Sequence, residues 1–413
     1  MSPRRLSSRM TADRRGLDAA GLTHLRDRLA AHVQNGDVPG LAALVARGDD
    51  VHVEVVGSPA VGDRTPLRRD AIFRIASLSK PIGAAGAMAL VDDGVLSVSD
   101  PVEKFLPELA ERRVLRSLGS PLGDTVPAER SITIEDLLTF RLGFGSIMAP
   151  PGTYPIQSAE VELGLMTLGP PWPPPSFGAD EWLARFATLP LMEQPGTTWR
   201  YNTGSHVLGF LIERASGKPL EAFLRDRLFE PLGMTDTSFR VPPEKRDRFT
   251  TAYYPSPDSG ALVVLDEPGA GWWSEPPALA NIAGMLVSTL DDFWAFVSLL
   301  VAGGRHGGHQ VLSPGSVADM TRNHLSAAQR TAAAPFLGAH DGWGYCMVAP
   351  APTKGRPPVP SGFGWNGGTG TVWTSDPASG LTGILLTQRA LTSPEPPPVF
   401  VDFWDAAYGA LAG

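Results

Sequence analysis

The sequence lacks the features that would support disulfide bonds or membrane spans. Its single cysteine, Cys346, has no second cysteine to pair with inside the chain. No apolar run approaches the ~20 residues that a membrane-spanning helix needs. Five arginines lie within the first 15 residues, but no apolar segment follows them, so this start does not resemble a secretory signal. We therefore expect a disordered basic tail over residues 1–16 and a cytoplasmic protein.

An excess of positive charge is also missing. The 413 residues carry 43 acidic and 35 basic side chains, which gives a formal net charge of −8. This balance argues against nucleic acid or an anionic membrane as the main partner, and solubility is its simplest explanation. With 43% hydrophobic residues, the chain can bury one large core or two modest ones, as a protein of enzyme size does.

Lysine is scarce, and one of the few lysines follows a serine by three residues. Only five of the 35 basic residues are lysines, and only Lys80 has a serine, Ser77, three residues before it. Positions i and i+3 share a helix face, so the Lys80 amine can reach the Ser77 hydroxyl. A buried lysine can lose its proton and act as a base, which an arginine cannot. Ser-x-x-Lys is typical of serine hydrolases that form an acyl-enzyme. A helix cap beside an unrelated lysine is the alternative.

The order of the expected elements indicates one sheet assembled from both ends of the chain. Strand-like runs occur near both ends, at residues 41–46, 51–56, 369–374 and 381–388. Helical periodicity occurs at residues 17–33, 77–94, 134–140, 179–187, 206–215 and 399–411. We predict an α+β fold whose antiparallel sheet domain comprises residues 17–80 and 270–413. Residues 81–269 would form a mainly helical domain with a Pro-rich, lid-like loop at 149–175.

Tyr201 is the candidate for the second proton-handling group that a Ser/Lys pair needs. It follows Gln194-Pro-Gly and stands at an expected junction between a loop and a helix. A neighbouring Lys80 ammonium would favour the phenolate and let Tyr201 relay the Ser77 proton. A core tyrosine with a satisfied hydroxyl is the alternative.

A glycine-rich segment, residues 362–371, precedes a strand-like run and is the candidate for an oxyanion hole. Glycine lets a backbone N–H approach a reacting carbonyl closely. The segment also contains Gly-x-Gly-x-x-Gly at Gly362, Gly364 and Gly367, but a dinucleotide site needs a strand before that motif and a helix after it. A strand follows here, so nucleotide binding is not expected. We expect neither a metal nor an organic cofactor.

Together with Ser77-x-x-Lys80, four further segments carry a resemblance to a known family. They are residues 90–107, 133–138, 231–234 and 286–292. With them, the chain resembles the serine β-lactamase-like superfamily, in the branch of class C β-lactamases and family VIII carboxylesterases. The resemblance extends from about Leu17 to the C-terminus and implies the β-lactamase/transpeptidase-like fold.

The resemblance also implies a role for each catalytic motif. Ser77 would be the acylated nucleophile, Lys80 its base or proton partner, and Tyr201 the general base and acid of a Tyr-x-Asn element. The backbone amides of Ser77 and Gly368 would form the oxyanion hole.

Two departures from the family pattern bear on the substrate. Thr203 replaces the asparagine of Tyr-x-Asn, and Trp365, which forms a Trp-x-Gly element with Gly367, replaces the lysine of Lys-Thr-Gly. The resemblance implies that this lysine helps to hold the carboxylate of a β-lactam, so its loss removes a contact worth ~1.5–3 kcal/mol. The esterase branch shows Trp-x-Gly, which suits neutral acyl or aryl esters. Phe144 and Trp172 are further candidates for the wall of an acyl pocket.

We therefore expect a serine hydrolase that cleaves carboxylic esters through a Ser77 acyl-enzyme. One alternative is a β-lactamase, amidase or D-amino-acid peptidase with the same machinery. A second is an acyltransferase that passes the acyl group to an alcohol or amine, and a third is a catalytically silent member of the fold that only binds. A Ser/His triad through His206 is not expected, because the chain has no Gly-x-Ser-x-Gly elbow.

Overall fold

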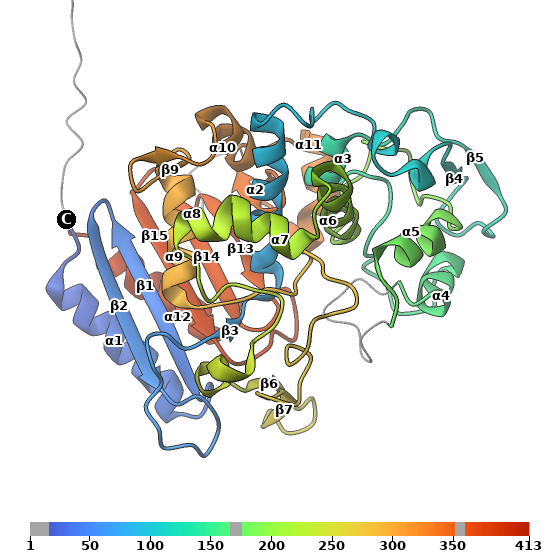
Figure 1. Ribbon diagram of the computed structural model, residues 1–413. Helices are drawn as coiled ribbons and strands as arrows, with labels where there is room; N and C mark the ends of the chain where they lie inside the picture. Colours follow the sequence, from blue (N-terminus) through green and yellow to red (C-terminus); the bar gives the residue numbers. More distant parts are fainter. Residues whose placement is uncertain (1–15, 166–175, 352–359, 413) are drawn as a thin grey trace, which may run out of the picture.

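The largest sheet has seven strands, each antiparallel to its neighbours, in the order β11-β12-β13-β14-β15-β1-β2 (Figure 1). The structure is a computed structural model that describes residues 16–165, 176–351 and 360–412. The strands are β1 (Gly40–Arg47), β2 (Asp50–Gly57), β11 (Asp341–Trp343), β12 (Val348–Pro350), β13 (Phe363–Gly367), β14 (Thr371–Asp376) and β15 (Leu381–Thr387). The predicted α+β fold, with a sheet built from both ends of the chain, is confirmed. The predicted tail, residues 1–16, lies outside the described residues apart from Gly16.

Strand β1 joins the two ends of the chain in the middle of this sheet. Its Leu44 lies opposite Ile384 of β15 on one side and Val53 of β2 on the other. Residues 40–46 are all buried, because layers of helices cover both faces of the sheet. Even-numbered side chains of β1 join the core shared with α2, and odd-numbered ones join the core beneath α1 and α12.

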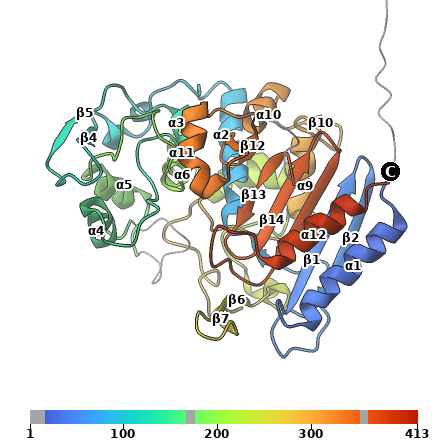
Figure 2. The same cartoon turned by 180° about the vertical axis from the view of Figure 1, so that it is seen from behind.

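Two terminal helices, α1 (Ala19–Gln34) and α12 (Pro398–Gly409), cover one face of the sheet, as Figure 2 shows. The Asp18 side chain caps α1 by accepting a hydrogen bond from the backbone N–H of Gly21. The Asp18 N–H donates to the carbonyl of Ala410 at 2.8 Å, so the two ends of the described chain lie together. The helices expected over 17–33 and 399–411 are both confirmed, with bounds shifted by one or two residues.

The opposite face carries α2 (Ser79–Asp92) and α9 (Leu290–Val301), and beyond them lies the mainly helical region (Figure 1). The other helices are α3 (Ile134–Leu138), α4 (Pro155–Glu162), α5 (Ala179–Ala187), α6 (Thr203–Ser216), α7 (Leu220–Leu224), α8 (Glu230–Leu232), α10 (Pro314–Thr321) and α11 (Ala327–Leu337). Short strand pairs complete the fold: β3 (Phe73–Arg74) with β8 (Val287–Ser288), β4 (Arg113–Leu115) with β5 (Thr125–Pro127), β6 (Ala252–Pro255) with β7 (Leu262–Asp266), and β9 (Arg305–His306) with β10 (His309–Gln310). Within the part of the chain that the structure describes, no helix combines the length and apolarity needed to cross a bilayer.

Two expectations about local structure are wrong. The segment 149–175, expected to be a loop, contains the helix α4, where Pro155 occupies the first turn and needs no N–H partner. Residues 166–175 of this segment lie outside the described residues. The helix expected to start at Ser77 begins at Ser79 instead, after a 3₁₀ turn.

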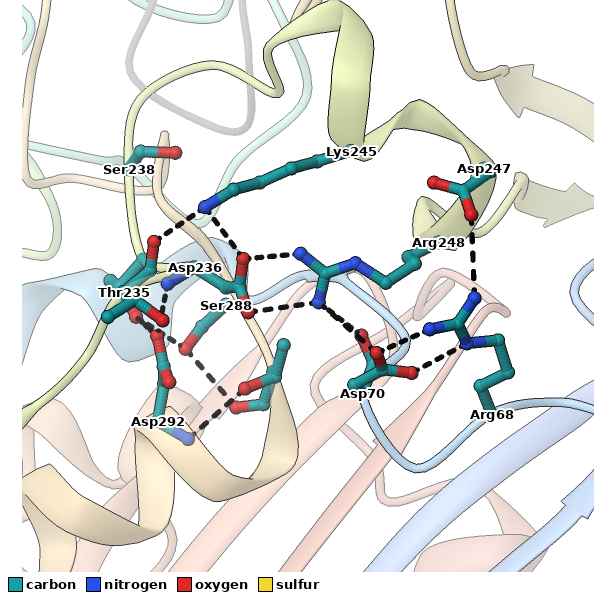
Figure 3. Close-up of polar contacts among 12 residues, drawn as sticks. Arg68, Asp70, Thr235, Asp236, Ser238, Lys245, Asp247, Arg248, Ser288 and Asp292 are labelled. Atoms are coloured by element: carbon teal, nitrogen blue, oxygen red, sulfur yellow. Dashed lines mark hydrogen bonds and ion pairs between the residues drawn. The ribbon is translucent and has the colours of Figure 1, made fainter.

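A network of charges connects the loop before β3 to the start of α9 (Figure 3). Arg248 lies 2.9 Å from Asp236 and 3.6 Å from Asp70, and Lys245 lies 2.8 Å from Asp236. The backbone N–H of Asp236 donates to the Asp292 carboxylate in the first turn of α9. Several charges that share partners hold a surface more firmly than isolated pairs do. The network therefore fixes the segment that leads through β3 to Ser77.

Candidate active site

Ser77 lies on a strained turn between β3 and α2. It belongs to the 3₁₀ turn η1 (Ala76–Leu78), and Ala76 before it has a φ of +43°, a left-handed conformation that costs an alanine roughly 1–2 kcal/mol. The Ser79 hydroxyl donates to the Ala76 carbonyl at 2.6 Å and accepts from the Leu286 N–H at 3.1 Å, which holds the turn. From residue 71 to residue 90, Ser77 alone is not buried. The turn thus presents one hydroxyl to a substrate.

Lys80 approaches Ser77 from the first turn of α2. Its Nζ lies 2.9 Å from Ser77 Oγ and also donates to the carbonyl of Ala283. Side chains at i and i+3 eclipse in a 3₁₀ turn, so the correction to the start of the helix leaves the pair in contact. The side chain is fully buried, and desolvation lowers the pKa of Lys80 to about 7. At neutral pH a large share of Lys80 is therefore a free amine.

Tyr201 contacts the same hydroxyl from the other side. Its phenol donates to Ser77 Oγ at 2.9 Å and accepts from Trp365 Nε1, also at 2.9 Å. Tyr201 comes just before α6, and Asn202 between them has a φ of +86°, so the junction predicted from the sequence is present and strained. Lys80 Nζ lies 4.7 Å from the centre of the Tyr201 ring.

The expectation that a charged Lys80 would favour the Tyr201 phenolate is wrong. Burial raises the pKa of Tyr201 above its ordinary value, because desolvation outweighs the hydrogen bonds that Tyr201 makes with Ser77 and Trp365. Burial also lowers the pKa of Lys80 to about 7, so near neutral pH much of the positive charge that would have lowered the pKa of Tyr201 is absent. The resting site therefore holds a phenol and an amine around Ser77.

Strand β13 brings Trp365 and the candidate oxyanion residue to the site. Gly367, its last residue, packs against η1 so closely that a Cβ there would lie 2.4 Å from the carbonyl oxygen of Ile75. Gly368 is exposed, although Gly367 and Thr369 on either side are buried. A Cβ on Gly368 would meet nothing within 4 Å. The backbone at Gly368 therefore borders open space, and its role as an oxyanion donor stays a prediction.

Aromatic rings surround Tyr201. Phe336 of α11 lies 4.6 Å from it between ring centroids, and Trp365 lies 5.6 Å away. Phe140, Trp199 and Trp343 lie within 5.7–6.4 Å of the same ring. Sequence reasoning missed Phe336, Phe140 and Trp343, because they come from separate elements that only the folded chain brings together. The rings help to bury Tyr201, and desolvation by burial raises its pKa.

The remaining sequence-predicted residues lie in different surroundings. Thr203 is the fully buried first residue of α6, and its hydroxyl has no hydrogen-bond partner among the described residues. Phe144 is buried in the core, where its ring packs edge-on against Phe186 at 5.0 Å. Trp172 lies outside the described residues. The roles of Thr203, Phe144 and Trp172 in substrate binding stay predictions.

His206 packs against another aromatic ring inside the protein. Its ring stacks on Trp182 at 5.7 Å inside the helical region, and burial lowers the pKa of His206 to about 3. The contacts of Ser77 Oγ described above come from Lys80 and Tyr201. Among the described residues, no group of three or more histidine, cysteine, aspartate or glutamate side chains is arranged to hold a metal ion.

Comparisons with known proteins identify relatives of this chain in sequence and in fold. Protein Rv1367c of Mycobacterium tuberculosis is 37% identical over 349 residues, 82% of each chain. Esterase EstB of Burkholderia gladioli is 29% identical over 417 residues, which cover 95% of this chain and 96% of EstB. The solved structure of EstCE1, described as a hydrolase with promiscuous acyltransferase activity, shares the fold with a TM-score of 0.75 at 23% identity, over 94% of this chain and 99% of that one. The family model described as Beta-lactamase matches residues 25–399, and the chain therefore belongs to the β-lactamase family.

Proposed function

We propose that this protein is a serine hydrolase that cleaves neutral carboxylic esters through an acyl-enzyme on Ser77. The observation that carries the proposal is the position of Ser77 Oγ, 2.9 Å from both the Lys80 amine and the Tyr201 phenol. The family assignment and the similarity to EstB, which is named an esterase, support the same reaction.

The two proton carriers divide the first half of the reaction between them. As Ser77 Oγ bonds to the ester carbonyl carbon, its proton passes to the Lys80 amine. The negative charge on the carbonyl oxygen would be stabilised by the backbone N–H groups of Ser77 and Gly368. When the ester C–O bond breaks, the Tyr201 phenol gives its proton to the departing alkoxide. Trp365 Nε1, which already donates to the Tyr201 oxygen, would stabilise the phenolate that forms.

Hydrolysis of the acyl-enzyme reverses these proton transfers. The Tyr201 phenolate takes a proton from the attacking water, and the Lys80 ammonium returns a proton to Ser77 Oγ as the acyl bond breaks. The free acid leaves, and both carriers regain their resting states. Their pKa values support this assignment, since Lys80 is readily deprotonated and Tyr201 begins as a phenol.

The surroundings of the site favour an uncharged substrate. Trp365 holds the position where the lysine of Lys-Thr-Gly would stand, and its indole is turned to the Tyr201 oxygen. The neighbouring rings of Phe336 and Trp343 also carry no charge. A substrate carboxylate would lose water here without gaining an ionic partner from these side chains, which costs free energy. Esters with apolar acyl or aryl groups should therefore be cleaved in preference to β-lactams that carry a carboxylate.

A comparison of two chromogenic substrates tests the proposal. We expect efficient hydrolysis of p-nitrophenyl butyrate and a kcat/KM on nitrocefin that is lower by at least about 100-fold, because the carboxylate contact is missing. Ser77→Ala should abolish ester hydrolysis and labelling by a fluorophosphonate, while Ser97→Ala, at an exposed serine, should leave both unchanged. A nitrocefin rate equal to the ester rate, or labelling that persists in Ser77→Ala, would contradict the proposal.

Acyl transfer uses the same acyl-enzyme and is the second candidate. The aromatic rings around Tyr201 limit water and suit an apolar alcohol as the acceptor. EstCE1, described as having promiscuous acyltransferase activity, shares the fold. Adding 1-butanol to the ester assay distinguishes the two outcomes, since a transferase forms butyl butyrate in place of butyrate.

A further inference from the structure

Three successive backbone carbonyls in front of Ser77 each accept a hydrogen bond from a side-chain hydroxyl. The donors are buried, and two of them come from the far end of the chain. The pairs are Thr369 Oγ1 with Arg74 O, Thr371 Oγ1 with Ile75 O at 3.2 Å, and Ser79 Oγ with Ala76 O at 2.6 Å. The segment that presents the nucleophile is thus tied to its surroundings at every residue from 74 to 76.

Thr369 lies in the turn that joins β13 to β14, and Thr371 is the first residue of β14. Gly368, the candidate oxyanion donor, directly precedes Thr369 in this turn. The carbonyl of Gly368 accepts from the N–H of Leu391 at 2.8 Å, which fixes one side of the turn. The tight contact between Gly367 and the Ile75 carbonyl leaves no room for the strand to move closer to Ser77. The hydroxyls of Thr369 and Thr371 prevent it from moving away.

The carbonyls that these threonines hold belong to a rigid segment. The Arg74 side chain is buried, bonds to Asp266 at 2.8 Å and lies 3.8 Å above the Phe249 ring. Ser79 bonds onward to the Leu286 N–H. The segment 74–76 is held rigidly, and the turn between β13 and β14 is fixed at Gly368. The threonine hydrogen bonds therefore set the distance between the backbone of this segment and the backbone of the turn.

We propose that Thr369 and Thr371, the threonine clamp, are positioning residues for the oxyanion hole. They set the spacing between the N–H of Ser77 and the N–H of Gly368, so that both donors point at the developing oxyanion. The inference rests on the proposed function, because it assigns the clamp a role in the same reaction. Oxyanion donors act only when they are preorganised, and a displacement of about 1 Å costs roughly 100-fold in rate.

Valine substitutions remove the clamp hydroxyls and keep the side-chain shape. We expect Thr369→Val to lower kcat on p-nitrophenyl butyrate by about 10- to 100-fold with KM changed less than about 2-fold, and Thr371→Val to lower kcat in the same direction. The affinity for a boronic acid transition-state analogue should fall by the same factor as kcat. Thr369→Ser, which keeps the hydroxyl, should restore most of the rate.

Thr382→Val is the matched control. Thr382 is a buried threonine of the same sheet, and its hydroxyl bonds to Ser375 Oγ at 3.0 Å, away from Ser77. This variant should lose a comparable amount of thermal stability without losing kcat. If Thr369→Val does not fold, Thr371→Val tests the same role. The hydrogen bond that Thr371→Val removes is longer, so we expect its loss to disturb folding less.

The possible results distinguish a failure of the clamp proposal from a failure of the proposed function. Ester turnover by the wild type with unchanged kcat in both valine variants would overturn the clamp alone. So would an equal loss of kcat in Thr382→Val, or a Thr369→Ser variant as slow as Thr369→Val. A wild type with no Ser77-dependent turnover or fluorophosphonate labelling would overturn the proposed function and the clamp together.

Discussion

Burial lowers the pKa of Lys80 to about 7, which makes it the candidate base for Ser77. The ionisable groups that influence it, Tyr201, Cys346 and His206, are all neutral near pH 7. Burial raises the pKa values of Tyr201 and Cys346 and lowers the pKa of His206 to about 3. Among the described residues, the contacts that would replace water around an ammonium group here are the Ser77 hydroxyl, the Ala283 carbonyl and the face of the Tyr201 ring. Its proton is therefore lost several pH units earlier than in a solvated lysine.

The pH dependence of catalysis should report this shift. Lys80 must be deprotonated to accept the Ser77 proton, so kcat/KM on a neutral ester should rise about tenfold per pH unit below pH 7 and level off above it. The raised pKa of Tyr201 keeps its phenol protonated, so no decline should follow between pH 7 and 9. Stopped-time assays from pH 5.5 to 9 would measure the profile. Lys80→Arg should be inactive throughout, because guanidinium stays charged. A flat profile would mean that Lys80 is not the base.

Among the site residues, those with a recognisable pattern could be found from the sequence. Ser77 and Lys80 have a fixed spacing, and Tyr201 comes at a loop-to-helix junction. The protonation state of Tyr201 could not be predicted, because it depends on rings from separate elements that enclose it. Thr369 and Thr371 gave no signal either, since a clamp hydroxyl and a surface hydroxyl look alike until the fold shows their partners.

At the scale of elements, two neighbouring glycines at the end of β13 and just after it have different surroundings. Gly367 allows the strand to contact the Ile75 carbonyl, while Gly368 borders open space. The sequence indicated that glycine here permits a close approach, but which glycine approaches which atom depends on the register of β13. That register is fixed by the pairing of β13 with β14, in which Trp365 lies opposite Trp373, and the atom that Gly367 approaches belongs to Ile75, far earlier in the chain.

Gly367→Ala tests the contact between β13 and the nucleophile turn. The new Cβ would lie 2.1 Å from Thr371 Oγ1 and 2.4 Å from the Ile75 carbonyl oxygen, so the strand must move away from η1. We expect kcat on p-nitrophenyl butyrate to fall by about 10-fold or more as the oxyanion donors separate. Gly119→Ala is the control, since a Cβ there meets nothing within 4 Å. Equal rates for Gly367→Ala and the wild type would show that the close approach is not needed for catalysis.

Strong periodicity made some elements predictable, and its absence hid others. The helix over 179–187 was predicted with the bounds that α5 has, because its apolar residues recur at helical spacing and Thr188 and Pro190 mark its end. The helix α4 was missed because proline and glycine dominate the sequence around it. Strand β13 was missed for the same reason, since its glycines lower strand propensity and tertiary pairing supplies the compensation.

On the scale of the whole molecule, the two chain ends form the layer that supports the site from behind. Helices α1 and α12 lie on one face of the sheet, while α2 lies toward the other (Figures 1 and 2). β1, near the start of the chain, pairs with β15, near its end, so the sheet closes only after nearly the whole chain is available. The order of strand-like and helical runs predicted this arrangement, because sheets join runs from both ends when a helical segment separates them.

The packing of α12 should therefore control stability without touching catalysis. Phe403 is fully buried and packs against Gly383 of β15. A Cβ on Gly383 would lie 3.0 Å from the Phe403 ring. Phe403→Ala should lower the free energy of unfolding by about 3–5 kcal/mol through lost burial and the cavity left behind. Val401→Ala, at a 47% exposed position of the same helix, should change it by less than about 0.5 kcal/mol. Denaturant titration measures both values. Because the site lies across the sheet, kcat/KM of folded Phe403→Ala at 20 °C should equal that of the wild type, and a lower value would mean that α12 also shapes the site.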